Sequence, residues 1–178
     1  MDSLVNRALR AAKLDASLYE EVEADQAALG QAMTVVVVSS VCAGIGSAAQ
    51  GGVVGLLLGA IAALIAWYIW AYLTYFIGTR LLPEAQTSAN VGELLRTTGF
   101  SSSPGVLRIL GIIPGLMTIA FVVSSIWMLV AMIVAVRQAL DYTSTGRAVG
   151  VCLIGWLVMM AIFSILAVLA APALVVSN

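Results

Sequence analysis

Seven ionisable side chains, set at the ends of long apolar segments, are the residues of this chain best suited to chemistry. Glu93 and Arg96 are three residues apart, and Arg137 and Asp141 are four apart, so each pair could form an ion pair on a helix. Guanidinium and carboxylate groups gathered near one surface bind phosphate groups, lipid headgroups or partner proteins, and they also anchor helix ends. The candidate polar or partner site consists of Arg80, Glu93, Arg96, Arg108, Arg137, Asp141 and Arg147.

The residue types give little support to catalysis or to a cofactor. The chain has no histidine, so it cannot build a Ser-His, Cys-His or HExxH arrangement, and it lacks the commonest ligand of haem, copper and zinc. Cys42 and Cys152 lie inside apolar runs without CxxC spacing, which indicates buried thiols. We expect no enzymatic activity, cofactor or metal. The net charge of −1 does not indicate nucleic-acid binding.

The composition is that of an integral membrane protein. Hydrophobic residues make up 62% of the 178 and charged residues only 10%, against about 25% charged in a soluble domain. Several apolar runs approach the roughly 20 residues that a helix needs to cross a bilayer. They lack the period-two alternation of a membrane barrel. The sequence therefore predicts an all-α polytopic bundle of transmembrane helices over residues 28–178, in contact with the lipid bilayer.

The segment 92–113 decides between four and five spans, because it is apolar but contains Glu93, Arg96 and Arg108. If it does not cross, basic residues fall on both sides of the membrane. If it crosses, every basic residue except Arg108 lies on one side, as the positive-inside rule favours. The expected topology then has a cytoplasmic N-terminus and an outer C-terminus, with Arg108 snorkelling to the outer surface. The expected spans are 28–48, 53–79, 92–113, 116–138 and 147–172.

Within that third span, Pro104 and Gly105 predict a kink or break, because proline removes a backbone donor and glycine weakens the helix. Neighbouring serines can satisfy the backbone groups that a break would leave unpaired. Broken helices line binding sites in some transporters, but they also occur as packing irregularities.

Small residues recur every four positions along the second span, at Gly51, Gly55 and Gly59. Such a face lets two membrane helices approach closely. It predicts a tight hairpin with the first span, or alternatively an interface between two copies of the chain.

Residues 1–27 form an arm without an apolar core of their own. Its first half predicts an amphipathic helix whose basic face, Arg7, Arg10 and Lys13, lies on anionic headgroups. The acidic residues that follow are expected to be solvated, or to bind a basic partner. They are Glu20, Glu21, Glu23 and Asp25.

The segments GELLRTTGFSSSPGVLRILGIIPG and WMLVAMIVAVRQALDYTSTGRAVGVCLIGW resemble the bacterial branch of the YIP family, the Ypt/Rab-GTPase-interacting membrane proteins. The resemblance extends from Ala28 to Val168. It rests on the Ser-Pro-containing third span, the Gly-Pro turn at 111–115 and the loop from Arg137 to Arg147. It implies five spans with a cytoplasmic N-terminus. Eukaryotic members act with Rab-type GTPases through a long cytosolic region, whereas the arm here has about 27 residues.

Three functional hypotheses follow. The first is a non-catalytic protein of the bacterial inner membrane that organises lipid or scaffolds a partner through its arm and its cytoplasmic charges. The second is a small transporter or channel, in which the broken third span carries Glu93, Arg96 and Arg108 along a path. The third is an accessory subunit of a larger membrane complex.

Overall fold

The computed structural model describes residues 3–47 and 52–176, and these residues fold as helices and short connections without strands. Two short helices come first, followed by longer apolar ones. A π-helical turn, η1, extends α4, and a 3₁₀ helix, η2, follows α5. The elements are α1 (Leu4–Ala12), α2 (Ala16–Ala24), α3 (Ala28–Gly46), α4 (Gly52–Phe76), η1 (Ile77–Leu81), α5 (Val91–Phe100), η2 (Ser103–Ile112), α6 (Met117–Ala139) and α7 (Thr145–Val176).

Four helical stretches are long and apolar enough to cross a membrane: α3, α4 continued by η1, α6, and residues 145–165 of α7. Their outer surfaces are rich in exposed leucine, isoleucine and valine, which only a lipid environment tolerates over so large an area. The chain is therefore an integral all-α membrane protein.

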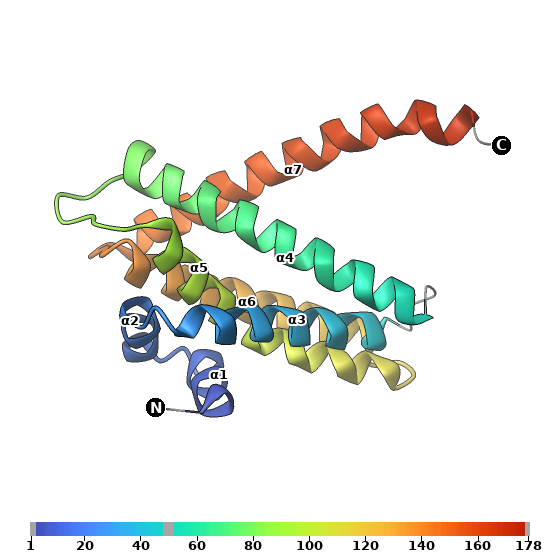
Figure 1. The fold of residues 1–178 in the computed structure, drawn as a ribbon, viewed down its shortest axis with the longest axis horizontal. Coiled ribbons are helices and arrows are strands. Elements are labelled where there is room, and N and C mark those ends of the chain that lie inside the picture. Colours follow the sequence, from blue (N-terminus) through green and yellow to red (C-terminus); the bar gives the residue numbers. More distant parts are fainter. Residues whose placement is uncertain (1–2, 48–51, 177–178) are drawn as a thin grey trace.

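The helices run back and forth between the same two ends of the bundle (Figure 1). α3 and the pair α5–η2 run side by side in the same direction. A Cβ atom added to Gly99 would lie 2.7 Å from Ala32 Cβ, and one added to Gly111 would lie 2.4 Å from the carbonyl oxygen of Gly46. α6 runs in the opposite direction along α5–η2. Arg108 in the second half of η2 donates to Ser124 in the first half of α6, and Ser101 at the end of α5 donates to Met132 in its second half.

The segment expected as a single third span is divided into α5 and η2 at Ser101 and Ser102. Pro104 stands in the first turn of η2, where its missing N–H costs no helical hydrogen bond. It therefore begins a helix rather than kinking one. The serine prediction is confirmed, since the Ser101 hydroxyl donates to the carbonyl oxygen of Thr98 at 2.7 Å and the Ser103 hydroxyl to that of Phe100 at 2.6 Å.

α2 is packed into the bundle and does not lie loosely on its surface. Its side chains Leu18, Tyr19 and Val22 are fully buried in the main hydrophobic cluster, together with residues of α5 and α6. Asp15 caps the helix by accepting a hydrogen bond from the backbone N–H of Ser17 at 3.0 Å.

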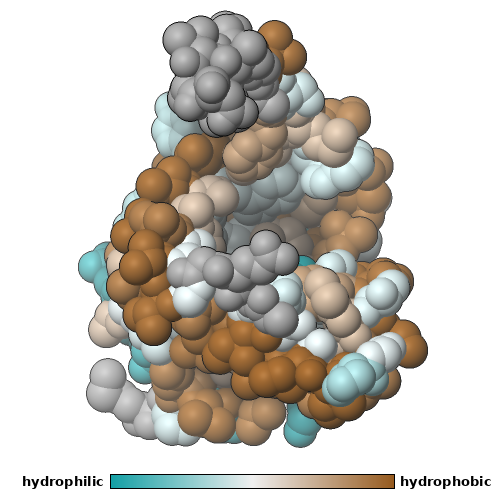
Figure 2. Space-filling view, turned by 90° about the vertical axis from the view of Figure 1, so that its right-hand side faces the viewer, coloured by the Kyte–Doolittle hydropathy of each residue, from teal (hydrophilic) through white to brown (hydrophobic). Residues whose placement is uncertain are grey.

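Two ends of the molecule differ in character. At one end α2 meets the loops 82–90 and 140–144; we call these three segments the polar end. At the opposite end α4 begins close to the end of α3, and α7 extends away from the other helices (Figure 1). Viewed from that opposite end, the surface is mostly apolar and encloses a hollow (Figure 2).

Candidate functional site

At the polar end, Arg137 stabilises the end of α6. Its Nε atom donates to the carbonyl oxygen of Tyr142 at 3.2 Å, and Nη2 donates to that of Thr143 at 3.4 Å. A cation at a helix C-terminus also complements the helix dipole. These contacts replace the expected ion pair with Asp141. Asp141 has a left-handed backbone conformation (φ 54°), and the chain turns there so that the carbonyls of the next two residues face the Arg137 guanidinium.

Glu84 connects the two loops of the polar end. Its carboxylate accepts hydrogen bonds from the backbone N–H and the hydroxyl of Thr143, at 2.9 and 2.7 Å, and from the N–H of Ser144 at 3.2 Å. Arg147 lies 3.6 Å from the same carboxylate and donates to the carbonyl oxygen of Pro83. These hydrogen bonds from Thr143 hold the pKa of Glu84 at about 2, so the contact is ionic at all physiological pH values.

Tyr142 adds a buried contact between the same loops. Its hydroxyl group lies 2.9 Å from the carbonyl oxygen of Gly78 and 2.8 Å from that of Leu82, so it can donate to either. These carbonyls belong to or follow η1, where the π-helical turn alters the regular hydrogen bonding. Burial raises the pKa of Tyr142 to about 12, and the hydroxyl remains a donor.

Arg96 and Glu93 do not pair with each other as the sequence predicts. Glu93 forms a capping box with Asn90 at the start of α5. The buried Arg96 reaches the C-terminal carbonyls of α2 instead, where Nε donates to Val22 at 2.9 Å and to Glu23 at 3.2 Å. Carbonyls of the last turn of a helix lack partners within the helix. Arg96 therefore links α5 to the end of α2.

The arm differs from expectation in the orientation of its arginines. Arg7 is 5% exposed and forms ion pairs with Glu21 at 2.8 Å and Asp25 at 2.9 Å. Arg10 pairs with Asp15 and Glu21. The two arginines thus bind the chain's own acidic residues rather than headgroups, because α1 folds back on α2.

The apolar face of α1 points outward instead, with Val5 66% and Leu9 56% exposed. An apolar groove of about 370 Å³ separates this face from α3 and η2. The indole N–H of Trp127 donates to the carbonyl oxygen of Ala12 at 2.7 Å, which fastens the end of α1 to α6.

A polar depression of about 680 Å³ lies between α2 and the two loops. Gln138 donates to the Glu20 carboxylate at 2.7 Å across one side. On α2, burial and the nearby charges of Glu93 and Asp141 together raise the pKa of Glu23 to about 7. The residues that line the depression are Glu20, Gln86, Arg137, Gln138, Asp141, Tyr142 and Thr143.

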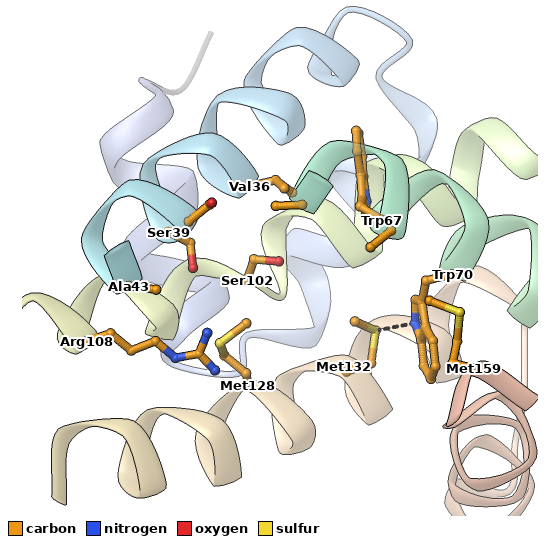
Figure 3. A pocket seen from close by; sticks show the side chains of 13 residues that line it. Val36, Ser39, Ala43, Trp67, Trp70, Ser102, Arg108, Met128, Met132 and Met159 are labelled. Carbon is orange, nitrogen blue, oxygen red and sulfur yellow. Dashed lines mark hydrogen bonds between the residues drawn. The ribbon is translucent and has the colours of Figure 1, made fainter. Parts of the chain in front are cut away.

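The structure brings five of the seven candidates, Glu93, Arg96, Arg137, Asp141 and Arg147, to the polar end or its rim. A sixth, Arg80, lies exposed on η1 beside it. Arg108 is separate. It does not snorkel outward, because Nε donates to the Ser124 hydroxyl at 3.2 Å and Nη2 to the Ser125 hydroxyl at 3.1 Å. Its side chain lines a cavity between the helices (Figure 3), while Arg96 points toward α2. The three residues of the transporter hypothesis therefore do not surround one cavity.

The small-residue face of α4 is not the contact with α3. A Cβ atom added to Gly55 or Gly59 would meet no atom within 4 Å, and Gly51 lies outside the described residues. The helices touch instead where Gly44 meets Leu56. The hairpin prediction is wrong in its choice of face, because α4 meets α3 through the side that carries Leu56, and Gly55 and Gly59 lie on other sides of the helix.

Sequence reasoning missed Tyr142 as a member of the site. Glu84 was expected near the same surface as the candidate residues, and Glu23 among the acidic residues of the arm, but their contacts were not predicted. A tyrosine within a polar loop was the available signal for Tyr142. The roles of Glu84 and Tyr142 depend on contact between two loops that are about sixty residues apart in sequence. Within the described ranges, no group of three histidine, cysteine, aspartate or glutamate residues could hold a metal ion.

One of three comparisons with known proteins identifies a family. No curated protein and no solved structure shows a significant match to the chain. The model of the Yip1 domain matches residues 16–166, from the first residue of α2 to the last third of α7. The match covers most of the chain and includes α2, the polar end and the divided segment α5–η2. The protein therefore belongs to the YIP family.

Proposed function

We propose that this protein is a non-catalytic scaffold of the bacterial inner membrane that crosses the bilayer five times and binds a partner protein at its polar end. The observation that carries the proposal is that hydrogen bonds and ion pairs hold two loops and the arm together as one polar surface. Outside that end, the described surface is largely apolar and suits lipid.

The fifth crossing is supported by length and direction. Ten α-helical residues followed by ten 3₁₀ residues extend about 35 Å, against about 30 Å for the hydrocarbon core. α5–η2 also runs alongside α3 for most of its length, from the contact of Gly99 with Ala32 to that of Gly111 with Gly46.

The orientation follows from the arginines. With five crossings, every basic residue except Arg108 lies in the arm or on a helix segment next to the polar end. Positive residues concentrate in short cytoplasmic loops, which supports a cytoplasmic polar end and arm. The C-terminus then lies outside.

A scaffold needs a surface that keeps its shape when the partner leaves. Glu84, Tyr142 and Arg147 hold the two loops together. Arg7 connects α1 to α2, and Arg96 connects α2 to α5. Charged and amide groups around the depression remain available for a polar partner. Gly105 packs directly against Ser39, and the cavity beside them is lined mainly by apolar side chains, which favours a scaffold over a transporter.

Photo-cross-linking in native membranes tests the proposal. A photoreactive amino acid placed at Arg80 or Asp141 is expected to capture one defined protein, while the same group at Ile61, on the lipid-facing side of α4, captures lipid. Capture should fall when Glu84→Ala loosens the loops. If the polar-end positions and Ile61 give the same products, the polar end is not a partner surface.

The open face at Gly55 and Gly59 leaves room for a second copy or for another subunit. Cross-linking from Gly59 separates these cases, because a homodimer gives an adduct of twice the mass and a larger complex gives a different partner.

A further inference from the structure

A cavity of about 360 Å³ lies among α3, α4, η2, α6 and α7, away from the polar end. Figure 3 shows Arg108 reaching from η2 toward Met128, with the hydroxyls of Ser39 and Ser102 on the same side of the cavity. Trp67, Trp70, Met132 and Met159 form the other side. The Trp70 N–H contacts the Met132 sulfur at 3.2 Å.

No acidic residue pairs with Arg108 in the part of the chain that the structure describes. A guanidinium keeps its proton at every accessible pH, and a charge inside the bilayer region is costly unless it is paired. The partners of Arg108 are neutral: the hydroxyls of Ser124 and Ser125, and the ring of Phe121 with its centroid 5.5 Å from the guanidinium carbon. No acidic residue lines the cavity. Its Nη1 group makes no hydrogen bond within the described residues.

The rest of the cavity is suited to hydrocarbon. Methionine and tryptophan side chains form adaptable apolar walls, and the other polar groups among the described lining residues are serine hydroxyls and indole N–H groups that contact Thr98 and Met132. The cavity lies between helices that form the apolar body of the protein, and the end view shows a hollow in a mostly apolar surface (Figure 2). A molecule that fills it must be anionic at one end and apolar along the rest.

We propose that this cavity binds a glycerophospholipid. Its phosphate pairs with Arg108 and accepts hydrogen bonds from the serines, and part of one acyl chain lies against Trp70, Met132 and Met159. The phosphate supplies the counter-charge that the described residues do not provide, since arginine binds phosphate oxygens through two parallel N–H groups. This site lies away from the proposed partner surface, so either proposal can fail alone.

Native mass spectrometry of protein purified in mild detergent tests the site. The wild type is expected to retain one phospholipid, and Arg108→Leu to reduce the retained fraction about tenfold through loss of the charge-assisted hydrogen bonds. Arg108→Lys should keep part of it. The matched control, Arg80→Leu, removes an exposed arginine and should retain lipid as the wild type does. Equal retention in Arg108→Leu and the wild type would overturn the proposal.

A second variant tests the site independently, in case Arg108→Leu does not fold. Ala66→Leu narrows the cavity without touching the arginine, and it is expected to lower retention while the thermal unfolding of the protein is preserved. Inorganic phosphate at millimolar concentration should leave the lipid bound. Displacement by phosphate, or full retention in Ala66→Leu, would show that the site takes a small anion or that lipid binds elsewhere, and either result contradicts the proposal.

Discussion

At the residue scale, Glu23 makes the stability of the fold depend on pH. Burial, with the nearby charges of Glu93, Asp141 and Glu20, raises its pKa to about 7 from a reference of 4.5, while Arg96 acts in the opposite direction. A raised carboxyl pKa means that the folded state holds a proton which the unfolded state releases. Its contribution to stability is complete below pH 4.5 and is lost as the pH rises through 7.

Glu23→Gln should therefore raise the midpoint of thermal unfolding by a few degrees at pH 8 and have little effect at pH 5. Thermal unfolding in detergent, followed from pH 5 to 8, measures this difference. The pKa values of Asp15 and Glu84, both about 2, place their titrations below that window. Glu84→Gln consequently serves as a control that keeps the wild-type slope. A constant gap between Glu23→Gln and the wild type at all pH values would contradict the assignment.

A second residue-scale prediction concerns Glu84, which holds the start of α7 to the loop 82–90. Glu84→Ala removes the acceptor of three hydrogen bonds from Thr143 and Ser144. We expect faster amide hydrogen exchange in residues 140–146 with unchanged exchange in α3 and α6, because the change is local. Ser88→Ala, on the exposed part of the same loop, is the control and should exchange as the wild type does. Unaltered protection at 140–146 would show that Tyr142 and Arg147 suffice to hold the loops.

At the element scale, the sequence predicted the apolar helices because long apolar runs have one stable form in lipid. It could not predict how the charged residues pair. Arg96 and Arg137 have nearer acidic neighbours along their helices, but they bind the carbonyls of α2 and of the loop 140–144. Unpaired helix-end carbonyls are strong acceptors whose positions depend on tertiary packing. The same holds for Gly55 and Gly59, since a small-residue pattern indicates that a helix permits close approach and does not show which neighbour uses it.

Two glycines in neighbouring helices give a matched test of this packing. A Cβ atom on Gly46 would lie 1.7 Å from the carbonyl oxygen of Arg108, whereas one on Gly55 would meet nothing within 4 Å. Gly46→Ala should therefore lower the free energy of unfolding by about 1–3 kcal/mol through overpacking of α3 against η2. Gly55→Ala should change it by less than about 0.5 kcal/mol. Equilibrium unfolding of both variants in the same detergent compares them. Equal effects would indicate that the space beside Gly55 is filled in solution.

At the scale of the whole molecule, the divided segment α5–η2 determines the topology. Neither half is long enough alone to be recognised as a span, and the four long helices by themselves would leave residues 82–116 on one side. Ser88 and Pro114 are both exposed and stand at opposite ends of this segment. Five crossings place them on opposite sides of the membrane, and four crossings place them together.

Single cysteines at these two positions distinguish the topologies. In a background where Cys42 and Cys152 are replaced by alanine, Pro114→Cys should react with a membrane-impermeant thiol reagent in intact cells. Ser88→Cys should react only after the membrane is permeabilised, because the loop 82–90 belongs to the polar end with its basic residues. Labelling of both positions from the same side would leave α5–η2 as a re-entrant segment. The C-terminus would then share a side with the arm, and the arginine asymmetry that supports a cytoplasmic polar end would disappear with the fifth crossing.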